Sequence, residues 1–472
     1  MLLAVVLAPP ARSLASPAPD GPGTLSHFDL ARKDCLGTAR SATSKVWYTV
    51  ANGVLSDVYY PTVDNTNVET LQYVVTDGAT FTDLQSRDTT YTVEALDPSG
   101  MACRVTSTAK SGQYRIVSDY VTDPDRNVLL VEVEFQPLVD VPLSLYVRFD
   151  PSVNGNGGGG SGNGGADSAS IDTSTGHPVG VSYDLDTATN AANRDYAQPV
   201  YLALDGPFDV VTNGFAGAGS DGLAELEATH ALATTYDVAL NGNVVQVAHL
   251  RSKASSARGH REAEALRATL ALGFGASASE AVSAAEASLR TPFFRTLAAY
   301  QAGWALYDRS LRPPPAHLPG VSPARTGALD RAYYLSANVV KASEDKTFPG
   351  AIAASLTSPW GQAVSAGDPN NTYFGSYREV FARDLYEAWT GLMADGDLQT
   401  ARDATLFLFE RQQLPDGSMP RNSLPNGKVA PDSFNTQLDE CSYPILMADQ
   451  LGMTDPTLYE DHIKPAANFV SA

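Results

Sequence analysis

The period of the hydrophobic pattern changes once along this sequence, near Gly273, and this change constrains the fold more than any other feature. From Phe28 to about Leu272 apolar and polar residues alternate, as in antiparallel strands that have one buried and one solvated face. After Gly273 the apolar residues recur every three or four positions, as on amphipathic helices. We therefore predict a multi-domain β + α chain, in which a large antiparallel sandwich of two layered sheets is followed by helical hairpins.

Local signals divide the chain further. The Asn52-Gly53 pair predicts a type I′ turn between strands over 45–50 and 54–60. Ser277 and Glu280 resemble a capping box at the start of a helix. Further helices are expected over 293–311, 327–342, 384–393, 398–412, 443–451 and from 461 onward. Prolines make a stiff connection ahead of the hairpins, so the expected parts are 1–24 (a signal-like segment and tail), 25–275 (the sandwich), 276–325 (a helical, proline-rich linker) and 326–472 (the hairpins).

Charge and composition exclude several classes of partner. The chain has 472 residues, with 32 basic and 53 acidic side chains, which gives a net charge of −21. An electric field of this sign repels phosphate backbones and anionic lipid surfaces, so we expect neither nucleic acid nor membrane binding. A neutral ligand such as a sugar is compatible with it. No long apolar run occurs, so no membrane-spanning helix is expected.

The N-terminus has two of the three parts of a secretory signal. Leu2 to Ala8 form a short apolar run, and small residues follow at 13–15. The basic stretch that normally precedes such a run is absent from the sequence. We expect the protein to be secreted, and we expect residues 16–19 to form a solvated tail.

The three cysteines fit neither a zinc spacing nor a dense disulfide scaffold. Cys35 and Cys103 can pair if they lie in one domain; the alternative is that Cys35, Cys103 and Cys441 are buried or unpaired thiols. The glycine-rich stretch 154–165 lacks the Gly-Lys-Ser/Thr ending of a phosphate-binding loop. We interpret it as a loop between two strands.

Two stretches of the helical part hold residue types that sugar chemistry needs. Arg383 and Asp384 place a cation and a carboxylate side by side at a helix start, where they match vicinal sugar hydroxyls. Asp384 also suits an ordinary N-cap. Tyr377 and Phe381 offer aromatic faces that stack on pyranose rings, although core packing is the commoner use of such residues.

Asp439 and Glu440 form a second candidate group. Glycoside hydrolysis needs a carboxylic acid that stays protonated near neutral pH and protonates the leaving oxygen. Proline is tolerated in a first helical turn, so Pro444 places Glu440 in that turn or just ahead of it. A helix N-terminus favours the ionised form, so a raised pKa of Glu440 requires burial and the like charge of Asp439. Without such surroundings an Asp-Glu pair is an ordinary solvated helix start.

Several ordered motifs resemble one known family. They are Lys33-Asp34, Gly37-Thr38-Ala39, Ser44 to Thr49, Val58-Tyr59-Tyr60-Pro61, Leu71-Gln72, Thr76-Asp77-Gly78, Thr347 to Ala351, Ala354-Ser355-Leu356 and Pro359-Trp360-Gly361. Through them, Phe28 to Ala472 resembles the bacterial glucoamylases and glucodextranases, the inverting glycoside hydrolases of family 15. The resemblance implies an N-terminal antiparallel β-supersandwich followed by a partial (α/α)6 barrel.

The resemblance also implies roles for individual residues. Glu440 matches the general acid, with Asp439 as its electrostatic neighbour. Arg383 and Asp384 match the pair that holds the non-reducing glucose in subsite −1. The implied substrate-binding residues are Arg383, Asp384, Tyr377, Trp360, Phe381 and Gln437. The aromatic wall and the substrate preference can differ from the family's, because the chain departs from the family pattern at Phe381, Ala382, Met419, Arg421 and Asn435.

One requirement of the family mechanism is unmet in this chain. Inversion needs a second carboxylate, about 6.5–9.5 Å from the first, to activate a water molecule. In the family this base lies further downstream, in the second half of the barrel, and no carboxylate of this chain matches its motif. We therefore expect a truncated chain with little or no activity.

The resemblance implies an exo-acting α-glucosidase of glucoamylase or glucodextranase type, which releases glucose from the non-reducing ends of neutral α-glucans with inversion. The alternatives are a trehalase-like hydrolase and a non-catalytic glucan-binding or structural sandwich protein with a vestigial barrel. The chemistry needs no metal or organic cofactor, and structural calcium is not indicated because no Asp-x-Asp-x-Asp-Gly loop occurs. We expect a monomer, and the choice between α-1,4 and α-1,6 linkages stays open.

Overall fold

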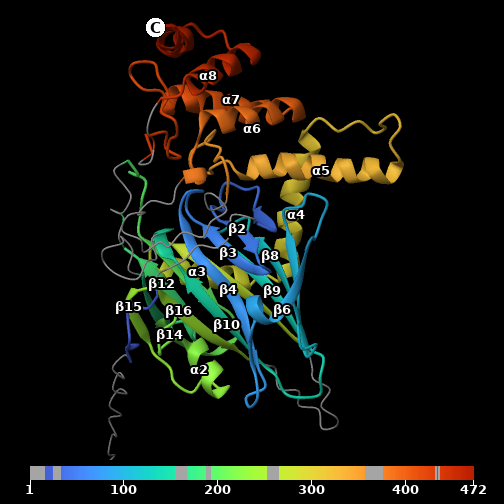
Figure 1. The fold of residues 1–472 in the computed structure, drawn as a ribbon, viewed down its shortest axis with the longest axis vertical. Helices are drawn as coiled ribbons and strands as arrows, with labels where there is room; N and C mark the ends of the chain where they lie inside the picture. The colour runs from blue at the N-terminus through green and yellow to red at the C-terminus, as the bar shows by residue number, and fades with distance from the viewer. Residues whose placement is uncertain are drawn as a thin grey trace, which may run out of the picture.

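The computed structural model describes residues 16–24, 33–155, 167–185, 187, 193–251, 265–356, 376–430, 433 and 436–472. Trp360, Asn435, the residues before 16 and most of the glycine-rich stretch lie outside the described residues, so the expectations made for them remain predictions. Figure 1 shows a tall β-sandwich with a group of helices above it. This order, strands first and helices second, is the one that the change of period predicts.

The sandwich consists of two antiparallel sheets, as expected. One has the order β1-β2-β3-β4-β10-β16-β14, with β5 beside β4. Its strands are β1 Cys35–Thr38, β2 Trp47–Ala51, β3 Val54–Tyr59, β4 Thr66–Thr76, β5 Thr82–Leu84, β10 Ser144–Pro151, β14 Phe208–Phe215 and β16 Val244–Leu250. The other has the order β15-β11-β12-β13-β17-β9-β8-β7-β6. Its strands are β6 Thr89–Ala95, β7 Cys103–Ala109, β8 Tyr114–Thr122, β9 Val128–Pro137, β11 Asp167–Asp172, β12 Val179–Asp184, β13 Val200–Asp205, β15 Val238–Gly242 and β17 Leu266–Gly275.

The main core lies between the facing sides of the two sheets. Alternate residues of the strands point into it, among them the fully buried Tyr73, Phe149 and Leu204. Asn52 and Gly53 join β2 to β3 and both have positive φ, 52° and 74°, as a type I′ turn requires. The predicted hairpin is therefore confirmed.

A disulfide and a paired N-terminal segment add covalent and backbone contacts to the sandwich. Cys35 and Cys103 form a disulfide between β1 and β7, so they link the two sheets, whereas the third cysteine is a free, buried thiol. Residues 16–24, part of the expected tail, are mostly exposed and also run along the sandwich, where the Ala18 N–H donates to the Val238 carbonyl at 2.8 Å. The unpaired backbone groups of the edge strand β15 explain this pairing, which sequence pattern alone does not reveal.

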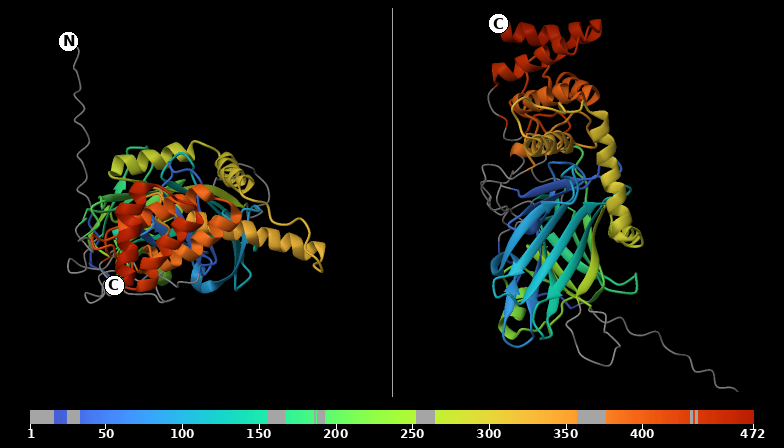
Figure 2. Two further views of the ribbon diagram at one scale, coloured as in Figure 1. Left: turned by 90° about the horizontal axis from the view of Figure 1, so that it is seen from above. Right: turned by 90° about the vertical axis from the view of Figure 1, so that its right-hand side faces the viewer.

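Two helices lead from the sandwich to the helical part. α3 (Ala278–Leu289) begins after Ser277, whose hydroxyl accepts the backbone N–H three residues later, as predicted. It packs so closely on β17 that a Cβ at Gly273 would overlap the Ala281 carbonyl, which explains the glycine where the period changes. α4 (Phe293–Ser310) then runs along the sandwich toward the helices, as Figure 2 shows.

The helical part begins with α5 (Pro323–Ala342), which extends away from the sandwich in Figures 1 and 2. It starts ahead of the predicted Gly327 because Ser322 caps it and proline suits a first helical position, so the expected boundary between 325 and 326 falls in its first turn. The later helices are α6 Ala382–Asp395, α7 Leu398–Phe407, α8 Leu438–Gln450, α9 Pro456–Leu458 and α10 Lys464–Ser471, with π-turns at Leu408–Gln412 and Tyr459–Ile463. Short elements elsewhere are α1 Gln85–Asp88, α2 Gly222–Thr229 and the 3-10 turns Val153–Gly155 and Ser376–Arg378.

The start of α8 differs from the sequence prediction. The helix begins at Leu438 rather than near Tyr443, and Pro444 lies inside it. A proline at this position removes the backbone hydrogen bond to the Glu440 carbonyl, and its ring crowds that carbonyl. Burial of Cys441 and Met447 against the neighbouring helices stabilises the helix despite that loss.

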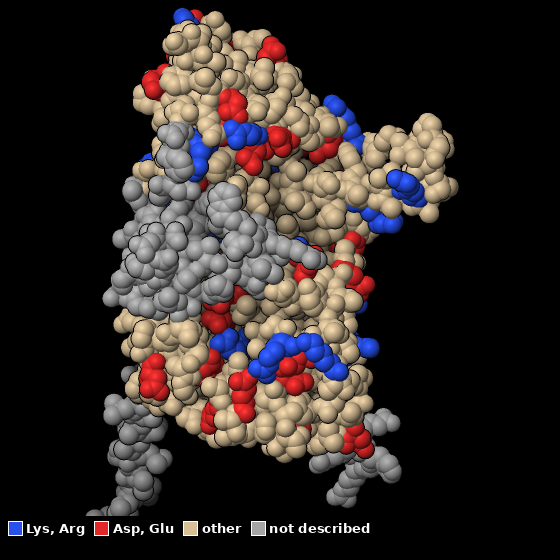
Figure 3. All heavy atoms as spheres, in the orientation of Figure 1, with Lys and Arg blue, Asp and Glu red and all other residues tan. Residues whose placement is uncertain are grey.

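The surface of the helical part is mixed in character. Figure 3 shows acidic and basic side chains interspersed on one face. Leu398, Leu438, Leu446 and Tyr459 are each at least 45% exposed. Scattered apolar residues are ordinary on protein surfaces, so these define no partner by themselves. None of the helices in the described ranges is long and apolar enough to cross a lipid bilayer.

Candidate active site

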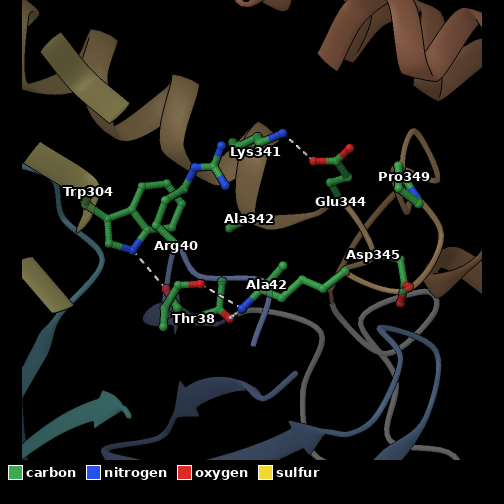
Figure 4. A pocket seen from close by; sticks show the side chains of 11 residues that line it. Thr38, Arg40, Ala42, Trp304, Lys341, Ala342, Glu344, Asp345 and Pro349 are labelled. Atoms are coloured by element: carbon green, nitrogen blue, oxygen red, sulfur yellow. Dashed lines mark hydrogen bonds and ion pairs between the residues drawn. The ribbon is translucent and has the colours of Figure 1, made fainter. Parts of the chain in front are cut away.

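The junction between the sandwich and the helical part is built largely from polar contacts. The Lys346 ammonium donates to Thr38 Oγ1 and to two carbonyls of the β1–β2 connection, at 2.6 to 2.7 Å. Asp345 is 1% exposed and accepts the Val63 N–H at 2.9 Å. Trp304 of α4 donates from Nε1 to the Thr38 carbonyl at 2.8 Å, beside a cavity of about 190 Å³ (Figure 4). These contacts hold the first helical loops on the sandwich.

α6 and α8 pack against each other and bring their first turns together. α6 begins after Phe381 and α8 begins after Gln437, and neither of these side chains caps its helix. Arg383 is the second residue of α6, and Glu440 is the third residue of α8. Asp384 lies in the first turn of α6, so its interpretation as an N-cap is wrong. The two stretches singled out in the sequence therefore meet at adjacent helix N-termini.

Arg383 lies at the centre of the resulting cluster. Its Nε donates to Asp439 Oδ2 at 2.7 Å, and its Nη2 donates to Gln437 Oε1 at 2.5 Å. Its Nη2 also lies 3.8 Å from Glu440 Oε1. The side chains of Arg383 and Asp439 are each 43% exposed, so a ligand can reach them from solvent. The sequence placed Arg383 beside Asp384, whereas the ion pair in the structure joins it to Asp439.

Glu440 is fully buried at the floor of this cluster. Its exposed fraction is 0%, and within the described ranges neither carboxylate oxygen has a hydrogen-bond partner. Burial raises the pKa of Glu440 to about 8; Arg383 and Arg421 lower it, while the charges of Asp439 and Asp384 raise it. The carboxyl group therefore stays protonated at neutral pH, which is the state that a general acid needs.

The raised pKa of Glu440 predicts a pH-dependent stability. The folded chain binds this proton more tightly than the unfolded chain, in which the pKa is near 4.5. The free energy of unfolding should therefore fall as the pH rises from about 4.5 to about 8, and Glu440→Gln should remove this contribution. Urea unfolding of both proteins across that range measures the difference. Burial also raises the pKa of Asp345, to about 7, but its contribution to the pH dependence is the same in both proteins and cancels in the difference. Parallel stability curves for the two proteins would contradict the raised pKa of Glu440.

Aromatic and polar residues surround the entrance to α6. The ring centroids of Tyr377 and Phe381 lie 5.8 Å apart, and the Arg421 guanidinium lies 5.7 Å from the Phe381 centroid. The sequence marked Arg421 only as a departure from the family pattern, and its effect on the pKa of the buried acid appears only in the structure. Asn422 donates to the buried Glu379 carboxylate. This pair lies in irregular segments, where no periodic signal could have revealed it.

The chemistry of the cluster suits a sugar. Within the ranges that the structure covers, no group of three His, Cys, Asp or Glu side chains is arranged to hold a metal ion. The cluster instead combines a guanidinium, an amide and carboxyl groups in one partly exposed area. Such mixed donors and acceptors match the hydroxyl groups of a pyranose ring.

Fold and cluster together define a class of protein, a large antiparallel β-sandwich followed by helical hairpins that carry a buried carboxyl group beside an arginine. The family described as glucodextranase, domain N, matches residues 18–309, which is more than half of the chain. The chain belongs to this family.

Two relatives extend the similarity into the helical part. A glucoamylase of Clostridium sp. (strain G0005) is 30% identical over 462 residues, which cover 96% of this chain and 58% of that protein. The crystal structure of a bacterial glucoamylase complexed with acarbose is 28% identical, with a TM-score of 0.80 and coverage of 96% of this chain and 60% of the other. The resemblance seen in the motifs and the sandwich-plus-helices fold are thereby confirmed. The chain spans less than two thirds of the length of either relative.

Proposed function

We propose that this chain is an exo-acting glycoside hydrolase of glucoamylase or glucodextranase type, in the inverting family 15 that its motifs resemble. The observation that carries the proposal is the buried Glu440 carboxyl, with its raised pKa, 3.8 Å from the Arg383 guanidinium. The similarity to a Clostridium glucoamylase and to a glucoamylase solved with acarbose supports the choice of a glucan-type substrate.

In this proposal Glu440 donates its proton to the glycosidic oxygen as the bond to the leaving sugar breaks. The carboxylate that remains gains a negative charge close to Arg383, whose positive charge stabilises it. Arg383 and Asp384 bind hydroxyls of the terminal glucose, while Asp439 and Gln437 keep the guanidinium in place. Tyr377 and Phe381 supply the aromatic wall that the resemblance implies.

Inversion also requires a carboxylate that activates water. The motifs of this chain that resemble the family match its acid and glucose-binding segments. We therefore assign to these residues the acid and the glucose-binding groups, and we name no base among them.

The proposal is tested by adding maltotriose (α-1,4) or isomaltotriose (α-1,6) to the purified chain and following each sugar by NMR. We expect the signals of the non-reducing glucose to broaden on binding, and the stronger response identifies the preferred linkage. Release of β-glucose would indicate that the chain supplies a base as well, contrary to the expectation from sequence. Failure of both sugars to bind would contradict the proposal. Binding that Arg383→Gln leaves unchanged would favour the non-catalytic glucan-binding alternative.

A secreted location is part of the same proposal. The apolar run Leu2 to Ala8 supports it, as does the Cys35–Cys103 disulfide, because such bonds persist mainly in oxidising compartments. Detection of the protein in the culture medium of its host tests this location.

A further inference from the structure

The end of the β3–β4 hairpin reaches from the sandwich into the helical part. Tyr59, the last residue of β3, and Thr66, the first of β4, are cross-strand partners and are both 0% exposed. The Tyr59 hydroxyl donates to the Leu356 carbonyl at 2.8 Å. Its ring also belongs to an apolar cluster that includes Ala353 and Leu356. The end of the hairpin is therefore in direct contact with residues 353–356, which follow α5 in the chain.

The same two residues hold Arg378. This arginine is 3% exposed, and its Nη1 donates to Thr66 Oγ1. Its guanidinium lies 5.5 Å from the centroid of the Tyr59 ring. A buried guanidinium is costly to leave without acceptors, so a hydroxyl at a fixed position on a rigid strand restrains it strongly.

Arg378 belongs to a short segment, residues 377–380, that is joined to its neighbours on two sides. The Ser355 N–H donates to the first carbonyl of the segment at 2.7 Å. Val380 exchanges two backbone hydrogen bonds of 2.9 Å with Ser423. The segment leads directly into the N-cap of α6. A displacement of Arg378 would therefore be transmitted to the aromatic wall and to the first turn of α6.

We propose that Tyr59 and Thr66 are positioning residues of the candidate active site, which hold Arg378 and thereby set the place of Tyr377 and of the start of α6. The inference rests on the proposed function, in which Tyr377 and Arg383 contact the sugar. The sandwich then contributes to the geometry of the site through Tyr59 and Thr66, which act on it by way of Arg378.

The test compares Thr66→Val with Thr66→Ser and Thr76→Val in the full chain. Thr66→Val removes the hydroxyl with little change of shape, and Thr66→Ser restores it. Thr76, at the other end of β4, is also buried, and its hydroxyl donates to the Phe81 carbonyl at 2.7 Å and accepts the Gly78 N–H at 3.0 Å. Thr76→Val therefore loses at least as many hydrogen bonds, far from the junction. Calorimetric titration with maltotriose measures binding, and hydrogen–deuterium exchange measures the protection of the 376–383 amides.

We expect Thr66→Val to weaken maltotriose binding about tenfold and to speed amide exchange in 376–383, with Thr66→Ser and Thr76→Val within about twofold of the unaltered chain. Tyr59→Phe, which removes the bond to Leu356, should act in the same direction as Thr66→Val. Unchanged exchange and affinity in both Thr66→Val and Tyr59→Phe would overturn the positioning role. If the unaltered chain binds no maltotriose, the proposed function fails, and the exchange rates then decide the positioning of the segment by themselves.

Discussion

Replacing Arg383 by glutamine should weaken the binding of maltotriose by about 100-fold, because the charge-assisted hydrogen bonds that the proposed site gives the sugar from this guanidinium are lost together. The guanidinium is partly exposed and is oriented by Asp439 and Gln437, at 2.7 and 2.5 Å, which suits a pre-formed binding group. Its removal also takes away the charge that lowers the pKa of Glu440, so that pKa should rise above its present value of about 8. Calorimetry measures the affinity, and an NMR titration measures the pKa.

Two further variants separate the causes of this effect. Arg383→Lys keeps the charge but loses the planar fork of donors, so it should bind with intermediate affinity. Arg402→Gln changes an exposed arginine of α7 and should leave the affinity unchanged. An affinity of Arg383→Gln within twofold of the unaltered chain would remove Arg383 from the glucose-binding site.

Replacing Lys346 by methionine should lower the free energy of unfolding by about 2–3 kcal/mol. The ammonium donates three hydrogen bonds to the sandwich, and methionine leaves their acceptors, among them Thr38 Oγ1, without that donor. Its Nζ also lies 4.9 Å from the centroid of the Trp47 ring, a contact that methionine loses. Burial and the nearby Arg40 charge hold the pKa of Lys346 well below its usual value, which offsets part of this stabilisation. Because these contacts cross the junction, the helical part should lose structure before the sandwich does. Urea unfolding followed by circular dichroism measures both the midpoint and the number of transitions.

Lys464→Met provides the matched control for this prediction. Lys464 pairs with Glu460 on the surface of the helical part, at 2.7 Å, with a side chain that is 49% exposed. Exposed pairs of this kind contribute little, so the variant should unfold at nearly the same urea midpoint as the unaltered chain. Equal midpoints for the two methionine variants would show that Lys346 does not stabilise the junction.

Local sequence signals were sufficient to predict the structure where the backbone conformation depends only on residues close together in the chain. Asn52 and Gly53 adopt the positive φ values of their turn, and Ser277 caps α3. Each outcome follows from sterics or hydrogen bonding within a few residues. The change of period near Gly273 also predicted that the sandwich comes before the helices, because the spacing of apolar residues shows which side of each strand or helix is buried.

Long-range packing decided the features that these signals could not predict. α8 tolerates Pro444 because its buried face packs against neighbouring helices. Residues 16–24 pair along the sandwich because an edge strand offers free backbone groups. Lys346 reaches across to a loop 302 to 308 residues earlier in the chain, and no local pattern encodes such a partner.

Glu440, the candidate acid, shows most clearly what depends on local sequence and what depends on tertiary packing. The sequence by itself determined that two carboxylates, Asp439 and Glu440, stand side by side at a helix start and that an arginine follows an aromatic segment at another. Successive residues of a helix point in different directions, so only one of the two carboxylates can face inward. Which one does so depends on how α8 packs against α6, whose Arg383 is 56 residues from Asp439 in the chain. The tertiary structure buries Glu440 and leaves Asp439 43% exposed, and because burial sets the pKa, it is the packing that makes Glu440 the proton donor of the proposed site.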